Sequence, residues 1–201
     1  NSGAPRIAYM FDALNALDNS MGRALVYRHG DPVDVIVALA NEVGADDVYV
    51  ARDFAPYGRR RDAEVGQRLK DLGKRLHGVG SPYAVDPGVV TKDDGLSYSV
   101  YTPYSKRWLA HGWSAPLDAP KDPQWHGAPT VPCEGPPARP DIEFELPPCN
   151  EEDVHDQWNE YRLRGVDGLD GYADRRNEVL PLERRGASGL SPWIRHGLLT
   201  L

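Results

Sequence analysis

The chain has 201 residues, a length that suffices for one well-filled core, or for one domain and part of another. Its residues are 40% hydrophobic and 26% charged, a composition that excludes a disordered protein. The formal net charge of −7 argues against a main nucleic-acid-binding surface, because phosphate contacts need clustered lysines and arginines. No apolar run reaches the roughly 18 residues of a membrane span and no signal-peptide pattern opens the chain, so we expect a cytoplasmic protein.

The first predicted element is a helix over Arg6–Leu17, where apolar residues recur at three- and four-residue spacing. The run Ala24–Arg28 is rich in β-forming residues and predicts a short strand. The Gly-Asp-Pro sequence at 30–32 then supplies a turn, an N-cap and a first-turn proline. It predicts a second helix that reaches about Val43 and stops at Gly44.

A strand over Asp47–Ala51, a helix over Arg60–Leu72 and a strand over Arg75–Val79 follow in order. Strands that alternate with helices predict a mainly parallel sheet covered on both faces, the doubly wound α/β class. Because a helix without a preceding strand opens the chain, we expect this sheet to lack its first strand. We therefore expect sequence upstream of Asn1 to be missing.

Residues 114–148 hold ten of the eighteen prolines, so they predict an extended connector without regular helix or central strand. Asn150 then resembles a helix start, and apolar residues continue at helical spacing to Leu163. The expected organisation is an α/β domain over 1–113, a proline-rich interdomain linker over 114–149, and the incomplete start of an all-α domain over 150–201.

No metal site is predicted. The only cysteines, Cys133 and Cys149, lack a second pair for a zinc site and are expected to be reduced thiols. The six histidines show no ligand spacing either. No dinucleotide-binding glycine motif, Walker loop or nucleophile elbow occurs, so nucleophilic hydrolysis is not expected.

Three stretches carry a resemblance to a known family. They are an Asp-rich loop ahead of an Arg-Arg-Asp helix start within Asp46–Leu69, the segments Gly80–Gly88 and Tyr98–Trp108, and the pair Leu169–Asn177 and Gly186–Pro192. In this order and spacing they resemble the photolyase/cryptochrome family. The chain is most similar to the N-terminal antenna-domain portion of a class I cyclobutane-pyrimidine-dimer photolyase, followed by the start of a helical flavin domain.

The resemblance implies a flavin adenine dinucleotide (FAD) site in the third stretch. Hydroxyl and amide donors there would converge on the FAD pyrophosphate near a helix N-terminus, although spacing alone also fits an ordinary capped helix start. The residues implied are Tyr172, Ser188, Gly189, Leu190 and Ser191. No catalytic residue is expected in these 201 residues, because the family's lesion pocket and electron relay lie in the rest of the helical domain.

The resemblance also implies an antenna-chromophore site where the Asp47–Ala51 strand ends, as is usual for doubly wound sheets. The Pro-Tyr-Gly-Arg sequence Pro56–Arg59 favours 8-hydroxy-5-deazaflavin over methenyltetrahydrofolate. Asp53 would accept a hydrogen bond from the chromophore, and Gly58 would admit its ring. The residues implied are Arg6, Asp53, Phe54, Tyr57, Gly58 and Arg61. A solvated helix start remains the alternative for the arginine run.

The activity implied is light-driven repair of cyclobutane pyrimidine dimers by electron transfer from reduced FAD, a carbon–carbon lyase reaction. The full-length protein would act as a monomer, without a membrane, and would bind damaged DNA through the missing C-terminal domain; this fragment alone would be inactive. Two alternatives stay open. One is a cryptochrome-like blue-light signalling flavoprotein, and the other is a plain nucleotide-binding α/β module.

Overall fold

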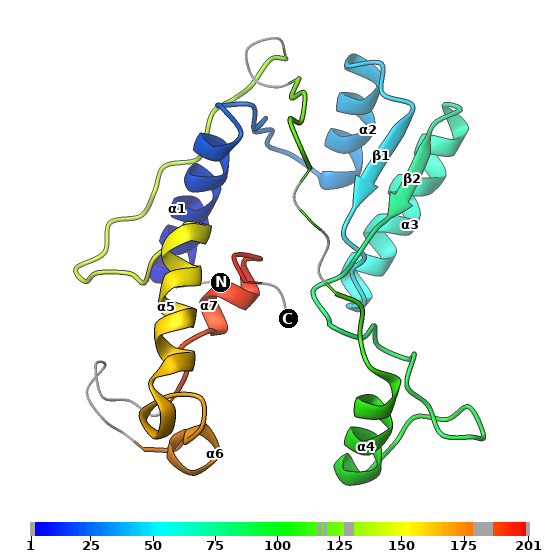
Figure 1. Ribbon diagram of the computed structural model, residues 1–201. Helices are drawn as coiled ribbons and strands as arrows, with labels where there is room; N and C mark the ends of the chain where they lie inside the picture. Colours follow the sequence, from blue (N-terminus) through cyan, green and yellow to red (C-terminus); the bar gives the residue numbers. More distant parts are fainter. Residues whose placement is uncertain (1–2, 116–117, 119, 127–130, 179–186, 200–201) are drawn as a thin grey trace. The chain divides into compact units, whose positions relative to one another are not determined.

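The computed structural model describes residues 3–115, 118, 120–126, 131–178 and 187–199 (Figure 1). Contacts within the chain divide it into two compact units. The sheet unit comprises the described residues of 27–124 and 131–134. The helical unit comprises the described residues of 3–26, 125–126 and 135–199.

The sheet unit is built around two parallel strands joined by a helix. Its elements are α2 (Pro32–Glu42), β1 (Asp47–Val50), α3 (Pro56–Asp71), β2 (Arg75–Gly78) and α4 (Tyr101–His111). The strands pair in parallel, from Asp47 opposite Arg75 to Val50 opposite Gly78. This strand–helix–strand order is the α/β arrangement that the sequence predicts, and the predicted fold class is confirmed.

The core of the sheet unit lies where α2 and α3 cover one face of the strands. Leu69 and Val65 of α3 are almost completely buried, and Val48 and Leu76 from neighbouring strands pack against them. The predicted start of α2 is confirmed, because the carboxylate of Asp31 accepts a hydrogen bond of 2.8 Å from the Val33 amide.

The helical unit contains α1 (Ala4–Ser20), α5 (Glu151–Leu163), a 3₁₀ turn η1 (Gly165–Asp167), α6 (Tyr172–Arg175) and α7 (Ser191–Arg195). Its core joins α1, α5 and α7 through the buried side chains of Tyr9, Val154 and Trp193. The Tyr9 hydroxyl and the Trp193 indole N–H both donate to the carbonyl oxygen of Pro148, at 2.6 and 3.0 Å. The end of the proline-rich connector is thereby fixed to two helices.

One predicted strand is wrong. Residues 24–28 form no strand, because their main-chain groups bond to isolated partners instead of a neighbouring strand. The Leu25 amide donates to the Asp18 carboxylate at 3.0 Å, and the Tyr27 carbonyl accepts from the Glu134 amide at 3.1 Å. Without a ladder on either side, β-propensity alone does not make a strand.

The remaining predicted elements follow the sequence closely, whereas the helix α4 was not predicted. α3 begins at Pro56, four residues before the predicted start, and α5 begins after Asn150, whose side chain accepts from the Asp153 amide at 2.9 Å. In the described part of 114–149 there is no helix or strand. Contacts group α1 with the helical unit, although the sequence assigns it to the α/β domain; the domain boundaries stay a prediction.

Candidate functional site

A cavity of about 600 Å³ opens in the sheet unit at the carboxyl ends of β1 and β2. This is the edge at which α/β sheets bind ligands. The cavity is lined by Val50, Arg52, Asp53, Phe54, Arg59, Asp62, Ala63, Leu76, Gly78 and Pro87. Asp53 and Phe54 were predicted for the antenna site, whereas Arg52, Arg59 and Asp62 were not.

The Asp53 carboxylate is fixed at the entry to α3. Its Oδ1 accepts a hydrogen bond of 2.9 Å from the Ala55 amide, and its other oxygen lies over the main chain of Gly58. A Cβ atom at Gly58 would overlap the Asp53 carboxyl group. Gly58 therefore admits the Asp53 side chain in this structure, a role different from the predicted one of admitting a chromophore ring.

The arginines around this cavity differ in how they are paired. Arg52 forms an ion pair of 2.7 Å with Asp86, and its Nε donates to the Gly80 carbonyl. The Arg59 amide donates to the Ala55 carbonyl, but its guanidinium has no hydrogen-bond or ion-pair partner among the described residues and is free to meet a ligand. The cavity consequently combines a fixed carboxylate with an available guanidinium.

Two other predicted antenna residues lie on α3 but do not line this cavity. Arg61 forms an ion pair of 2.7 Å with Asp62 and lies over the Tyr57 ring, 5.9 Å from its centroid. Tyr57 itself is 60% exposed. Arg6 belongs to the helical unit, so the sheet unit by itself brings together Asp53, Phe54 and Gly58.

A second cavity, of about 690 Å³, lies in the helical unit between α1, the end of the connector and α7. It contains Ser191 from the predicted FAD set and Arg6 from the predicted antenna set. Arg195 also lines it, and neither arginine has an ion-pair partner among the described residues. No carboxylate lines this cavity, so its charge suits an anionic group.

The rest of the predicted FAD set lies elsewhere in the helical unit. Leu190 packs on the core around Trp193, and Gly189 has a φ of +71°, which favours glycine. Ser188 is half-buried beside them. Tyr172 begins α6 and does not line the cavity that contains Ser191. Ser191 therefore lines the same cavity as Arg6, whereas Tyr172 does not line it.

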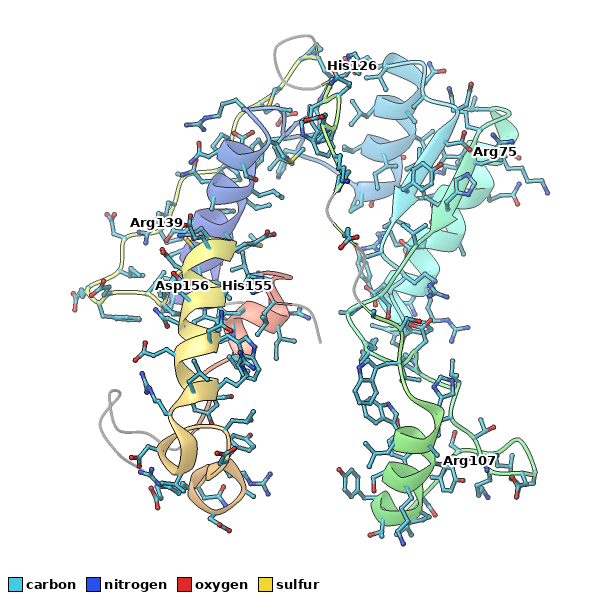
Figure 2. All side chains as sticks on the ribbon, viewed as in Figure 1. Arg75, Arg107, His126, Arg139, His155 and Asp156 are labelled. Carbon is cyan, nitrogen blue, oxygen red and sulfur yellow. The ribbon has the colours of Figure 1, made fainter. Side chains whose placement is uncertain are left out.

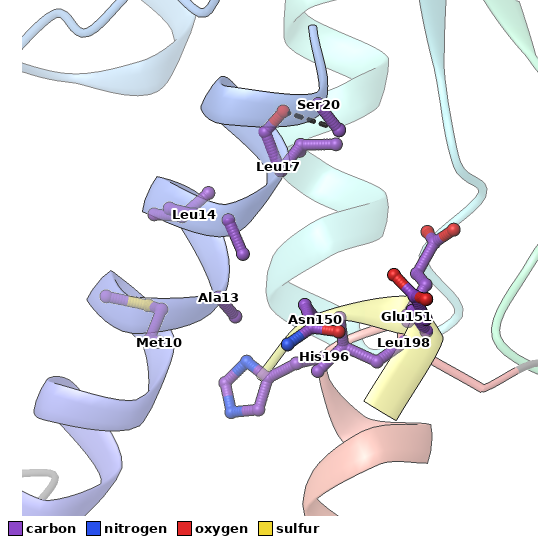
Figure 3. Close-up of a pocket in the computed structure, with 12 residues that line it drawn as sticks. Met10, Ala13, Leu14, Leu17, Ser20, Asn150, Glu151, His196 and Leu198 are labelled. Carbon is purple, nitrogen blue, oxygen red and sulfur yellow. Dashed lines mark hydrogen bonds between the residues drawn. The ribbon is translucent and has the colours of Figure 1, made fainter. Parts of the chain in front are cut away.

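A further cavity of about 410 Å³ follows the apolar side of α1 (Figure 3). Met10, Leu14 and Leu17 form one wall, and His196 lies at its base between this cavity and the one that contains Ser191. Burial, followed by the charge of Arg195, lowers the pKa of His196, so its ring is neutral at pH 7.

Comparison with known proteins identifies the family. The family model for DNA photolyase matches residues 1–123, which is more than half of the chain. The chain belongs to the DNA photolyase family. The class I subtype stays a prediction.

Several curated relatives of this photolyase-family chain are named deoxyribodipyrimidine photo-lyase. The protein of that name from Thermus thermophilus is 32% identical over 193 residues, which is 94% of this chain and 40% of the relative. The one from Synechococcus sp. (strain ATCC 27144) is 33% identical over 58% of this chain and 25% of the relative. An uncharacterized 31.6 kDa protein from Synechococcus sp. (strain PCC 6716) is 35% identical over 59% of this chain.

Solved structures agree with this assignment. A bacterial class III photolyase from Agrobacterium tumefaciens superposes with a TM-score of 0.68 at 25% identity, over 99% of this chain and 42% of that one. A Synechocystis cryptochrome superposes with a TM-score of 0.79 at 20% identity, which shows a common fold. The photolyase-family chain spans less than half of the length of each of these relatives.

The described residues contain neither a membrane-spanning helix nor a metal-binding cluster. None of their helices has the length and apolar character needed to cross a membrane. Among them, no cluster of three or more His, Cys, Asp or Glu side chains is arranged to hold a metal ion.

Proposed function

We propose that the whole protein containing this chain is a deoxyribodipyrimidine photo-lyase, which splits cyclobutane pyrimidine dimers in damaged DNA under light. The observation that carries the proposal is the match to the Thermus thermophilus photo-lyase, which extends over 94% of this chain. The match includes the connector and the helical segment, beyond the residues that the family model matches.

In this proposal the cavity at the ends of β1 and β2 holds the antenna chromophore. Its volume of about 600 Å³ suits a chromophore of several fused rings. Asp53 accepts a hydrogen bond from the ring system, Phe54 packs against it, and Arg59 contacts its polar edge. The Pro-Tyr-Gly-Arg sequence that starts α3 favours 8-hydroxy-5-deazaflavin over methenyltetrahydrofolate.

FAD fits the cavity of the helical unit only in part. Ser191 offers a hydroxyl, and the unpaired guanidiniums of Arg6 and Arg195 suit the pyrophosphate charge. When bound and reduced, FAD supplies the electron that splits the dimer. Tyr172 does not line this cavity, and we propose that the chain forms one part of the FAD site while the helical domain of the whole protein provides the remainder.

The partner that we propose is damaged DNA, bound by the C-terminal part of the whole protein. We propose that the whole protein acts as a cytoplasmic monomer. The lesion must leave the base stack to reach the flavin. The net charge of −7 on this chain agrees with a DNA-binding surface located outside it.

A cryptochrome-like signalling flavoprotein is the second candidate, because the Synechocystis cryptochrome shares the fold at a TM-score of 0.79. A plain nucleotide-binding module is less well supported, since the DNA photolyase family model covers residues 1–123.

The decisive measurement is the loss of cyclobutane dimers from ultraviolet-irradiated DNA. We expect the whole protein to remove them under blue light and to leave them intact in darkness, and we expect this 201-residue chain alone to remove none. Unchanged dimers with a flavin-loaded whole protein under blue light would favour the cryptochrome. A whole protein that carries no flavin under any condition would refute both.

The antenna assignment is tested on the same protein by absorption. Asp53→Asn and Arg61→Ala should each reduce the occupancy of 8-hydroxy-5-deazaflavin, with the larger effect at Asp53, because only Asp53 lines the cavity. Glu64→Gln, on the exposed side of α3, is the matched control. Full occupancy in the Arg61→Ala variant would remove Arg61 from the site.

A further inference from the structure

A separate cavity in the sheet unit is lined mainly by aromatic rings. It has a volume of about 400 Å³ and lies between the segment 83–85 and the helix α4. Its lining consists of Tyr83, Ala84, Val85, Tyr104, Trp108 and Trp113. None of these residues belongs to the predicted FAD or antenna sets.

The chain geometry at the end of α4 produces this lining. Gly112 ends the helix with a φ of +70°, a conformation that favours glycine, and turns the chain back. Trp113 consequently stacks on Trp108, with ring centroids 5.0 Å apart and planes inclined by 27°. Tyr104, one turn earlier than Trp108, meets Tyr98 edge-on at 6.1 Å. The rings are thus held by one another and by the turn.

These aromatic side chains do not serve a hydrophobic core. α4 has no buried residue, and none of the lining residues belongs to the core cluster of the sheet unit. Tyr83 and Trp113 remain 51% and 54% exposed. Large aromatic rings that are preorganised and yet open to solvent mark a surface for binding.

The charges near the cavity limit what it can bind. No charged side chain lines it. Arg107, labelled in Figure 2, is the charged neighbour of Trp108 on α4. It forms an ion pair with Asp93 and lines a different cavity with Val89 and His111. A strongly charged ligand would therefore lose its hydration without gaining a counter-charge. An uncharged ligand does not lose the hydration of a charge when it binds.

This cavity is distinct from the candidate antenna cavity, although the two are neighbours. Their linings share no residue. The Phe54 ring of the antenna cavity meets the Tyr83 ring edge-to-face at 6.0 Å, so one aromatic pair forms the wall between them.

We propose that the cavity formed by Tyr83, Tyr104, Trp108 and Trp113 binds a small, uncharged, planar heteroaromatic molecule. The ligand stacks on the aromatic walls, and its ring nitrogens face the open mouth. A volume of about 400 Å³ lies in the range of small-molecule sites. Each ring that stacks on a ligand contributes between about fivefold and about 150-fold to affinity.

The test uses the 201-residue chain with quinoxaline and phenazine as uncharged probes. The five tryptophan indole N–H signals in an NMR spectrum, assigned by single Trp→Phe variants, report where a probe binds. We expect the Trp108 and Trp113 signals to shift with saturation, while those of Trp125, Trp158 and Trp193 stay in place. Probe binding itself is measured on the unmodified chain, and the conservative Trp→Phe variants serve only to assign its signals.

Variants then measure the contribution of each wall. Tyr104→Leu and Trp108→Leu should each weaken probe binding at least about tenfold. Trp125→Leu removes a tryptophan that is 50% exposed outside the cavity, and Asp53→Asn alters the antenna cavity; both should leave affinity within about twofold. The sulfonated probe naphthalene-2-sulfonate should bind more weakly than quinoxaline.

Three results would overturn the proposal. The first is unchanged affinity in both α4 variants with retained helical circular dichroism. The second is an equal loss of affinity in Asp53→Asn, which would place the probe in the antenna cavity. The third is tighter, Trp108-dependent binding of single-stranded oligothymidylate, which would make this surface a nucleic-acid contact.

Discussion

Gly58 shows at the level of one residue why the Asp-rich loop needs glycine in the first turn of α3. A Cβ atom there would overlap the carboxyl group of Asp53. Gly58→Ala must therefore displace the carboxylate, and its hydrogen bond to the Ala55 amide is lost. We expect a loss of about 1–3 kcal/mol in the free energy of unfolding and a weaker antenna site, measured by urea denaturation and by chromophore occupancy.

Gly66 in the same helix provides the matched control. A Cβ atom at Gly66 would meet the Leu76 side chain at an ordinary 3.7 Å. Gly66→Ala should accordingly stabilise the chain by about 0.5–1 kcal/mol, because alanine suits a helix better than glycine. If both variants were equally destabilised, glycine would be required at position 58 for the packing of the helix and not for the position of the Asp53 carboxylate.

Asp47 on β1 anchors a charged network on the exposed side of the sheet. It accepts hydrogen bonds from Nε of Arg75 at 2.7 Å and from Nε2 of His77 at 2.6 Å, and Arg75 is labelled in Figure 2. His77 also stacks on Tyr49, with ring centroids 4.9 Å apart. The hydrogen bonds from Arg75 and then from His77 hold the pKa of Asp47 well below its usual range.

This lowered pKa predicts how stability depends on pH. A carboxyl group with a lower pKa in the folded state stabilises the protein above its unfolded pKa of about 3.9, and the contribution is lost as pH falls further. We expect Asp47→Asn to lower the urea midpoint at pH 6–8 and to lose this difference progressively below about pH 4. A difference from the unmodified chain that does not vary with pH would contradict the ionic origin of the effect.

Among the elements, α1 and α7 are tied together by a single carbonyl of the connector. The Tyr9 hydroxyl and the Trp193 indole both donate to Pro148, and Tyr9 is only 4% exposed. Tyr9→Phe removes one donor and should lower the free energy of unfolding by about 0.5–1.5 kcal/mol. Tyr101→Phe, at a 78% exposed tyrosine, is the control and should change it by less than about 0.5 kcal/mol.

The ionisation of Tyr9 also makes the contribution of this hydrogen bond to stability depend on pH in the alkaline range. Burial, followed by the nearby charge of Cys149, raises the pKa of Tyr9 to about 12. A group whose pKa is raised on folding keeps its contribution below the unfolded pKa, here about 10, and loses it as pH rises toward 12. The decline in stability between these values should be smaller in Tyr9→Phe, and an identical decline would disprove the assignment.

Elements with a local signal were predictable from the sequence. Asp31 and Asn150 cap α2 and α5 as expected, because a cap depends only on residues within the next turn. The wrong strand at 24–28 and the unpredicted helix α4 depend on partners that a local pattern does not contain. Arg52 and Arg59 were missed at the candidate antenna site for a similar reason, since only the β1–α3–β2 geometry brings them to one cavity.

On the scale of the whole molecule, the part of the chain that the structure describes forms two hydrophobic cores, one in each unit. Val65 anchors the core of the sheet unit and Val154 that of the helical unit, at 2% and 0% exposure. Stability can then be lost locally in one core while the other persists. The same substitution, Val→Ala, can be made in each core and compared directly.

Val65→Ala and Val154→Ala should each cost roughly 2 kcal/mol, from the lost burial of two carbon atoms and the cavity left behind. Hydrogen exchange followed by mass spectrometry locates the loss. We expect Val65→Ala to speed exchange in α2, α3 and β1, and Val154→Ala to speed it in α1 and α5, with the opposite unit within error of the unmodified chain. If either variant speeds exchange equally in both units, the two cores unfold as one cooperative structure, and mutations in α1 would then weaken the candidate antenna cavity as well.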